Sequence, residues 1–194
     1  MRIIAGEARG RRLAAVRGSE VRPTGDRVRE ALFSLLLARA GLPDPETTVV
    51  LDLYAGSGAL GLEALSRGAV EAHFVEVDIA AAATVQENLD KCGFAGRGRV
   101  HRSSVSAFLA RGAGGPAGCE LIFMDPPYAA AAGLVASLTA LALPLMAPAA
   151  VVVAEHHARQ PPPDAAGCLR LVHRRSWGDT AMSFYRPEAA SSAW

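Results

Sequence analysis

Four consecutive residues, Asp125-Pro126-Pro127-Tyr128, place two hydrogen-bond acceptors beside an aromatic ring. They follow an apolar run at 121–124 that is typical of a buried strand. Proline fixes φ and has no amide N–H, so the Pro126 carbonyl is a rigid acceptor, and the Asp125 carboxylate is a second one. Together they can hold an exocyclic NH₂ group, while Tyr128 stacks on the base that carries it. We therefore predict that all four residues form a catalytic site that modifies an amino nitrogen.

Catalysis at such a site depends mainly on positioning. The lone pair of an aromatic amine is delocalised, and acceptors at its N–H groups favour the pyramidal nitrogen that develops in the transition state. Holding both reactants in near-attack geometry supplies several of the roughly 7 to 11 kcal/mol available from proximity. No strong base is needed beforehand, since the proton can leave after the transfer.

A glycine-rich turn follows the apolar strand expected at 49–53 and leads into a helix. Gly56, Gly58 and Gly61 match the G-x-G-x-x-G pattern of dinucleotide-binding turns, where the missing side chains let the backbone approach a ligand closely. Glu76, at the end of the second expected strand, is placed to accept hydrogen bonds from ribose hydroxyls. These features fit a nicotinamide dinucleotide as well as S-adenosylmethionine.

Asp52 distinguishes between the two cofactors. It lies at the end of the first strand on the ligand's side of the turn, where a carboxylate repels a pyrophosphate and attracts the cationic amino group of a methionine moiety. We therefore predict S-adenosylmethionine as the cofactor. The expected contacts from the first two strands are Asp52, Tyr54, Ala55, Gly56, Ser57, Gly58, Glu76 and Val77.

The adenine ring is expected at the end of the third strand, near Ser103, Ser104 and Val105. A second interpretation of Ser104 is that it caps the helix that follows, because serine is a favoured N-cap residue. The sequence leaves both roles open.

Strands and helices alternate along the chain. The apolar pattern predicts strands at 49–53, 72–77, 99–102, 121–124 and 150–154, and helices near 58–67, 79–92, 104–111 and 130–142. This order implies right-handed crossovers and a parallel sheet covered on both faces. Two later runs, at 169–174 and 181–186, flank a turn at 177–180 and are expected to pair as an antiparallel edge hairpin.

The amino-terminal segment is basic. Residues 1–30 hold eight arginines and four acidic residues, a net charge of +4, whereas the rest of the chain carries −3. Arginine releases counterions when it neutralises phosphates, so this distribution suits a polyanionic partner. Charge alone equally allows a solvated surface segment, since Lys91 is the one lysine of an arginine-rich chain. Gly6 and Gly10 divide residues 2–14 into an expected β-hairpin.

We therefore expect a basic arm at 1–25 and one main domain at 26–194. Asp26 is expected to cap the first helix of that domain, and Gly41 to end it. The apolar face of this helix is expected to hold Val28, Leu32, Leu35 and Leu36.

Several sequence features argue against a membrane, a secretory or a metal protein. The amino terminus is charged before an apolar signal region can form, which predicts a cytoplasmic protein. Pro144 and Pro148 divide the uncharged run 129–154 into shorter pieces. His156 and His157 are adjacent, so on a strand they point to opposite faces. The cysteines Cys92, Cys119 and Cys168 share no ligand spacing, and no metal is expected.

Over nearly its whole length the chain resembles the bacterial 16S ribosomal RNA guanine-N2 methyltransferases. The segments that carry the resemblance are Arg2-Ile3-Ile4-Ala5-Gly6, Arg9-Gly10-Arg11-Arg12-Leu13, Arg22-Pro23-Thr24, residues 26–33 and residues 51–68. The resemblance implies a class I S-adenosylmethionine-dependent methyltransferase fold, Rossmann-like, with seven mostly parallel strands and a terminal antiparallel hairpin. The chain departs from the family at Ser104-Val105: the family often has Asp or Asn at this place near the adenine.

The resemblance also implies a substrate and its contacts. It implies methyl transfer to the exocyclic N2 of a guanine in 16S rRNA. We expect the partner to be 16S rRNA, in the 30S subunit or its assembly intermediate, and the protein to act as a monomer without a metal. Thr24 would border the cofactor pocket. The expected RNA-binding residues are Arg9, Arg11, Arg12, Arg22, Arg27 and Arg29.

Two alternatives stay open. The tetrapeptide at 125–128 is shared with DNA adenine-N6 methyltransferases, so a DNA substrate fits the same chemistry. A non-catalytic rRNA-binding assembly factor would use the arm alone, although the acidic residues Asp52, Glu76 and Asp125 are all present. Glutamine methylation fits less well, because there the tetrapeptide usually begins with Asn.

Overall fold

The computed structural model describes residues 1–16, 25–44, 46–111, 116–126, 131–141 and 143–188. Its helices are α1 (Asp26–Ala40), α2 (Ala59–Ser66), α3 (Ile79–Cys92), α4 (Val105–Arg111) and α5 (Ala131–Ala140), with a short 3-10 helix, η2, at Leu143–Leu145. Its strands are β1 (Val49–Leu53), β2 (Glu71–Glu76), β3 (Gly98–Arg102), β4 (Cys119–Met124), β5 (Met146–His157), β6 (Ala165–Ala166), β7 (Leu169–Trp177) and β8 (Thr180–Pro187).

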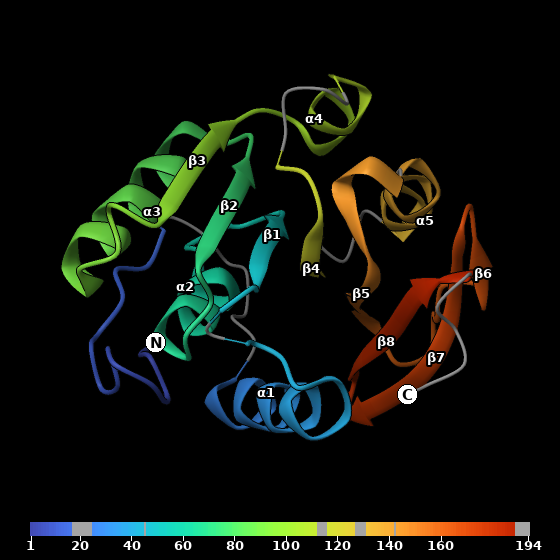
Figure 1. Ribbon diagram of the computed structural model, residues 1–194, viewed down its shortest axis with the longest axis horizontal. Coiled ribbons are helices and arrows are strands. Elements are labelled where there is room, and N and C mark those ends of the chain that lie inside the picture. Colours follow the sequence, from blue (N-terminus) through green and yellow to red (C-terminus); the bar gives the residue numbers. More distant parts are fainter. Residues whose placement is uncertain (17–24, 45, 112–115, 127–130, 142, 189–194) are drawn as a thin grey trace.

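The strands form one sheet in the order β3-β2-β1-β4-β5-β8-β7-β6 (Figure 1). Strands β1 to β5 run parallel, and β8 pairs antiparallel with both β5 and β7. The predicted parallel sheet with a terminal antiparallel hairpin is therefore confirmed. The expected number of strands was wrong: the sheet has eight, because Gly167 at φ 58° reverses the chain so that two-residue β6 pairs with β7.

The sheet is covered on both faces. Figure 1 shows α1, α2 and α3 on one side and α4 and α5 on the other. Successive strand residues point to opposite faces, so Val50 and Phe123 belong to the core under α1 to α3, whereas Leu51 and Ile122 belong to the core under α4 and α5. The strands are thus held between two apolar layers, which fixes the positions of the residues at their carboxyl ends.

Helix α1 differs from the prediction at its beginning. Gly25 is the N-cap, and Asp26 is the first helical residue and makes no capping bond. The Asp26 carboxylate instead pairs with Arg29 at 2.8 Å and with Arg2 at 3.4 Å. Gly41 ends the helix in the left-handed region at φ 65°, as predicted. The buried residues of the helix are Arg29, Leu32, Phe33 and Leu36.

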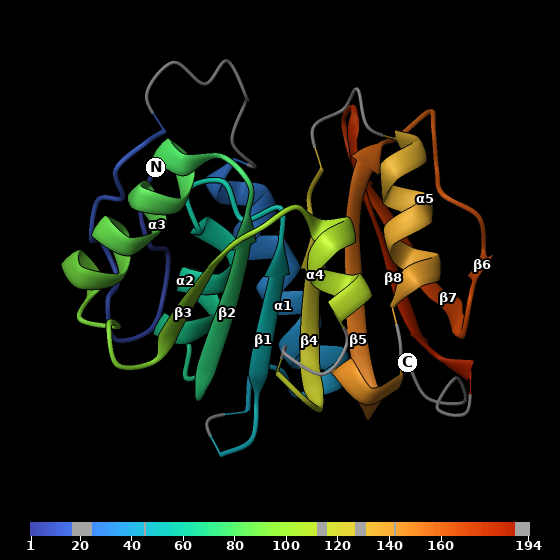
Figure 2. The ribbon, with the colours of Figure 1, turned by 90° about the horizontal axis from the view of Figure 1, so that it is seen from above.

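The described part of the arm, residues 1–16, folds back on itself. Arg2 and Arg12 form a single antiparallel bridge, so the expected hairpin is reduced to one bridge. Apolar residues of the arm, Ile3, Ala8 and Leu13, lie in the same core as α1 and α2. Figure 2 shows the amino terminus beside α2 and α3, and β6 and β7 at the opposite end of the sheet.

None of the helices in the described part of the chain is long and apolar enough to cross a membrane. Among the described residues, no group of three or more His, Cys, Asp or Glu side chains could hold a metal ion. His156 is buried, and its Nε2 lies 2.8 Å from the Ser183 hydroxyl of β8. The His156 side chain therefore forms a hydrogen bond that connects β5 with β8.

Candidate cofactor and substrate site

The carboxyl ends of the parallel strands bring the predicted site residues to one edge of the sheet. In the register, Leu53 lies beside Val75 and Met124, and Met124 lies beside Ala154. The residues that follow these four are Tyr54, Glu76, Asp125 and Glu155. Four segments distant in sequence therefore meet at the edge where ligands bind in sheets of this kind.

The backbone of the glycine turn adopts rare conformations. Gly56 and Gly58 have φ angles of 56° and 81°, and Tyr54 has a φ of 73° although it is not a glycine. The N–H groups of Tyr54 and Ala55 donate to the Val75 carbonyl of β2 at 3.2 and 3.1 Å. Positive φ is readily accessible to glycine but strained for tyrosine. Strained residues cluster at ligand-binding sites, and here the neighbouring strand holds Tyr54 in place.

Gly61 has a packing role. A Cβ atom at this position would lie 2.4 Å from Phe74 Cε1 of β2. The absence of a side chain therefore lets α2 lie close against the sheet, and its amino terminus stays beside the turn.

Asp52 lies beneath the turn. Its side chain is 2% exposed, and its Oδ2 accepts a 3.0 Å hydrogen bond from the Gly61 N–H. The pKa of this carboxyl is raised to about 7, chiefly by burial; the Gly61 hydrogen bond lowers it, and the negative charge of Glu76 adds to the rise. Such a group gains its charge readily when a cation comes close. The arrangement is consistent with an ammonium ligand, and the contact itself stays a prediction.

Glu76 closes the other side of the turn. Its Oε2 accepts from the Gly56 N–H at 2.8 Å, and its Oε1 accepts from the Asp78 N–H at 2.9 Å. A carboxylate has about four acceptor positions, so both oxygens can still accept from ribose hydroxyls. Beyond it, Val77 and Ile79 expose 66% and 68% of their surface, which leaves two apolar side chains available to an aromatic ring.

Ser104 is the N-cap of α4. Its hydroxyl accepts from the Ala107 N–H at 3.2 Å, and its carbonyl accepts from the Phe108 N–H at 2.9 Å. Of the two interpretations of this residue, the structure therefore bears out the capping role. Val105 is buried, so an adenine contact by its side chain would use only a small exposed area.

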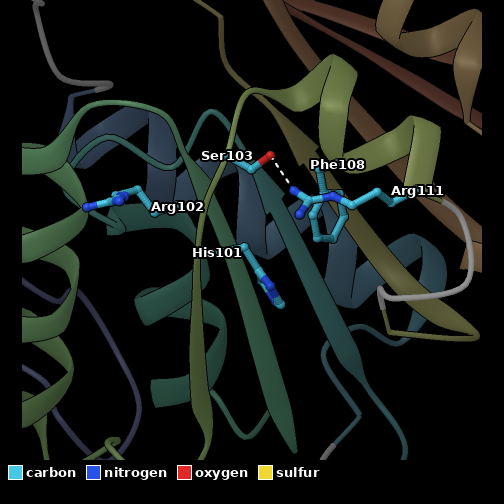
Figure 3. A pocket seen from close by; sticks show the side chains of 5 residues that line it. All are labelled: His101, Arg102, Ser103, Phe108 and Arg111. Atoms are coloured by element: carbon cyan, nitrogen blue, oxygen red, sulfur yellow. Dashed lines mark hydrogen bonds between the residues drawn. The ribbon is translucent and has the colours of Figure 1, made fainter.

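A cavity of about 280 Å³ lies between β3 and α4, lined by His101, Arg102, Ser103, Phe108 and Arg111. Figure 3 shows His101, Phe108 and Arg111 on one side of β3, with Arg102 pointing away from them. Arg111 Nη2 donates to the Ser103 hydroxyl at 2.6 Å, and burial lowers the pKa of His101. The predicted adenine position at Ser103 therefore borders a cavity with arginine in its walls.

Two residues of the predicted catalytic tetrapeptide are described. Asp125 is half-buried and Pro126 is buried, directly after β4. The β1–β4 register places them next to Tyr54 at the edge of the sheet. The predicted site residues that lie outside the described part are Arg22, Thr24, Pro127 and Tyr128, whose roles stay predictions.

Four of the arginines predicted to bind RNA lie at the surface. Arg9, Arg12 and Arg27 are exposed. Arg11 is exposed too, and its Nη1 donates to the carbonyl of Lys91 near the end of α3. These side chains are accessible to a polyanion, and Arg11 also fastens the arm to α3.

Arg29 corrects the prediction. Its side chain is 1% exposed, and its Nη2 donates to Asp26 Oδ1 and to the Arg2 carbonyl, both at 2.8 Å. Burial lowers the pKa of its guanidinium, and the carboxylate of Asp26 opposes this shift. The expectation that Arg29 binds RNA was wrong, because a buried side chain with these partners does not reach a phosphate. It joins α1 to the arm instead.

Two buried polar residues that the sequence patterns did not single out connect the arm to the site. Glu63 of α2 is 0% exposed and accepts from the N–H groups of Ile4 and Ala5 at 2.8 and 3.0 Å. Asn88 of α3 is also 0% exposed and forms hydrogen bonds with Ala14. Each lies among apolar residues on the buried side of its helix, and this break in the apolar pattern was the available signal.

The chain is similar in sequence and in fold to known proteins. The family described as conserved hypothetical protein 95 matches residues 1–186. YlbH of Bacillus subtilis is 35% identical over 187 residues, which cover 96% of this chain and 98% of YlbH. Ribosomal RNA small subunit methyltransferase D of Escherichia coli is 44% identical over 128 residues, covering 66% of this chain and 60% of that protein. The solved structure of yhhF from Escherichia coli matches with a TM-score of 0.80 at 36% identity, covering 97% and 98% of the two chains. The chain therefore belongs to the conserved hypothetical protein 95 family.

Proposed function

We propose that this chain transfers a methyl group from S-adenosylmethionine to the exocyclic N2 of a guanine in 16S ribosomal RNA. One observation carries the proposal: the sheet register places the glycine turn, with Asp52 beneath it and Glu76 beside it, one strand away from Asp125 and Pro126. A cofactor held by Asp52 and Glu76 would therefore face an amine held by Asp125 and Pro126.

The residues around the turn fit S-adenosylmethionine. The buried carboxyl of Asp52 suits a cationic amino group, and the carboxylate of Glu76 suits ribose hydroxyls. The exposed apolar side chains of Val77 and Ile79 suit an adenine face. A pyrophosphate would meet two acidic side chains at the same turn, which disfavours a nicotinamide dinucleotide.

The substrate is inferred from the arm and from the relatives. The arm lies beside α2 and α3 (Figure 2). Its arginines Arg9, Arg11 and Arg12 are exposed. The Escherichia coli relative is named as a methyltransferase of small-subunit ribosomal RNA. We infer that the partner is 16S rRNA, in the 30S subunit or its assembly intermediate. We also infer that the protein acts as a metal-free monomer in the cytoplasm.

The reaction needs little beyond positioning by this chain. The bound cofactor would supply an electrophilic methyl group on its sulfonium. The Asp125 carboxylate and the Pro126 carbonyl accept from the amine N–H groups and orient the nitrogen lone pair, and Asp125 is placed to take up the proton that the nitrogen loses. Tyr128 is expected to stack on the flipped guanine.

A labelled-methyl transfer assay tests the proposal. Purified protein is incubated with radiolabelled S-adenosylmethionine and, separately, naked 16S rRNA, 30S particles and duplex DNA. We expect label in rRNA, recovered as N2-methylguanosine after digestion. Label in DNA adenine would favour the alternative DNA substrate. Cofactor binding without transfer to any nucleic acid would favour a non-catalytic assembly factor.

A further inference from the structure

We propose that Asn88 of α3 couples RNA binding by the arm to cofactor binding at the glycine turn. The inference rests on the proposed function, because it takes the arm to be the RNA-binding segment and the turn to be the cofactor site. Asn88 is a positioning residue in this account: it acts on both segments through hydrogen bonds and touches neither ligand.

The side chain of Asn88 bridges the two segments directly. Its Oδ1 accepts from the Ala14 N–H at 2.7 Å, and its Nδ2 donates to the Ala14 carbonyl at 3.1 Å. The same Nδ2 donates to the carbonyl of Ser57 at 2.9 Å. Ser57 lies between Gly56 and Gly58, the two positive-φ glycines of the turn. One buried amide therefore holds both the carboxyl end of the described arm and the middle of the turn.

Burial makes these hydrogen bonds sensitive to movement. Asn88 is 0% exposed, so a shift of Ala14 or Ser57 would leave buried polar groups without partners. A buried polar group without a partner loses its hydrogen bond and gains none from water, which disfavours such a shift. The arm and the turn are therefore expected to keep or lose this arrangement together.

The rest of the arm is anchored to α2, the helix that directly follows the turn. Glu7 N–H donates to the Ser66 carbonyl at 2.8 Å, and Ala8 N–H donates to the Ser66 hydroxyl at 3.0 Å. Glu63 holds the preceding N–H groups of Ile4 and Ala5. The exposed arginines of the arm thus lie on a segment fixed at both ends to the elements that frame the turn.

This arrangement predicts reciprocal coupling. If RNA orders the arm, the bonds of Asn88 order the Ser57 carbonyl, and the turn then binds cofactor with less loss of conformational entropy. By linkage, cofactor must tighten RNA binding by the same factor. Couplings between two sites in one protein are typically about 5- to 150-fold.

The coupling is measured as a ratio of two affinities. Calorimetry gives the Kd of S-adenosylhomocysteine for the full chain, alone and with saturating naked 16S rRNA. We expect RNA to tighten cofactor binding about fivefold or more in the unaltered protein. In Asn88→Ala this ratio should fall to about one. The exposed Gln86→Ala on the same helix is the matched control and should keep the ratio of the unaltered protein.

A merely structural role for Asn88 would change stability or both affinities and leave their ratio intact, and that result would overturn the proposal. Because Asn88→Ala could fail to fold, a second measurement uses the unaltered protein without RNA. The Ala14 N–H donates a hydrogen bond to Asn88 Oδ1. Hydrogen exchange at this N–H should slow about fivefold or more when S-adenosylhomocysteine is added.

The two possible failures are distinguishable. Saturable binding of S-adenosylhomocysteine with unchanged exchange at Ala14 would overturn the coupling and leave the proposed function intact. Absence of any S-adenosylhomocysteine binding would overturn the proposed function, and the coupling with it.

Discussion

At the scale of single residues, the site is built from carboxyl groups in contrasting surroundings. Asp52 is buried beneath the turn, whereas Glu76 is half-buried and bonded to two backbone N–H groups. Asp125 is half-buried at the next strand end. We assign the first two to cofactor recognition and the third to the amine, because the β1–β4 register separates them in this way.

The raised pKa of Asp52 predicts a pH-dependent cofactor affinity. With a pKa of about 7 the carboxyl is largely neutral at pH 6 and largely ionised at pH 8. The ionised form attracts the amino group of the cofactor, so affinity for S-adenosylhomocysteine should rise as the pH increases through 7. Calorimetry between pH 5.5 and 8 tests this. Asp52→Asn should bind more weakly and flatten the profile, and an unchanged slope in this variant would assign the pH dependence to another group.

Asp125→Ala separates the substrate side from the cofactor side. Removal of one acceptor for the amine should lower methyl transfer on the order of 10²- to 10³-fold, comparable with loss of one preorganised transition-state contact. The affinity for S-adenosylhomocysteine should change little, because Asp125 belongs to the neighbouring strand end. Single-turnover transfer and calorimetry give the two quantities. Equal losses in both would mean that Asp125 mainly shapes the cofactor pocket.

At the scale of elements, the apolar pattern predicted most of the sheet. The bounds expected for β1, 49–53, agree with the structure, and the other parallel strands were located within a few residues. Strand β5 is longer than the 150–154 expected, because Met146 pairs with Cys119 of β4 at its beginning and pairing with β8 continues through His157 at its end. Strand β6 has two residues and depends on the turn at Gly167, so no periodicity could reveal it.

Tertiary contacts between distant segments account for the features of the site that the sequence alone does not reveal. The sequence suggested that Arg29 belongs to a basic surface, but its guanidinium donates hydrogen bonds to the Arg2 carbonyl and the Asp26 carboxylate. The bonds of Asn88 join residues separated from it by 74 and 31 positions, which no local pattern encodes. The glycine turn and the tetrapeptide were found because each is contiguous in sequence.

Because the arm packs against α2, two glycine substitutions in the arm are expected to lower the free energy of unfolding by different amounts. A Cβ at Gly6 would lie 1.7 Å from the Ser66 carbonyl oxygen, whereas a Cβ at Gly10 would meet nothing within 4 Å. Both have positive φ, at 81° and 84°, so backbone strain is common to Gly6→Ala and Gly10→Ala. Gly6→Ala should therefore lower the free energy of unfolding by about 1 to 3 kcal/mol more than Gly10→Ala. Urea denaturation measures this difference, and equal costs would show that the arm does not rest on α2 in solution.

At the scale of the whole molecule, charge is divided between the amino-terminal segment and the rest of the chain. Residues 1–30 carry +4 and the remainder carries −3, within an overall net charge of +1. The arm lies beside α2 and α3, and β7 lies at the opposite end of the sheet (Figure 2). A polyanion is therefore expected to approach from the arm's end.

Removing arm arginines should change the salt dependence of RNA binding. Each lost phosphate contact lowers the slope of log affinity against log salt by about one unit. Arg9→Ala with Arg12→Ala should reduce both affinity and slope, and Arg170→Ala on β7 is the control at the far end of the sheet. Filter binding to naked 16S rRNA at several salt concentrations gives the slopes. A slope that is the same in all three proteins would remove the arm from the interface.

The most direct test of the central claim is the modification state of small-subunit rRNA in cells that lack this protein. Primer extension and nucleoside analysis should show that one N2-methylguanosine present in the parent strain is missing. The unaltered protein should restore the mark, and Asp125→Ala should not. An rRNA with every guanine modified as in the parent would contradict the account.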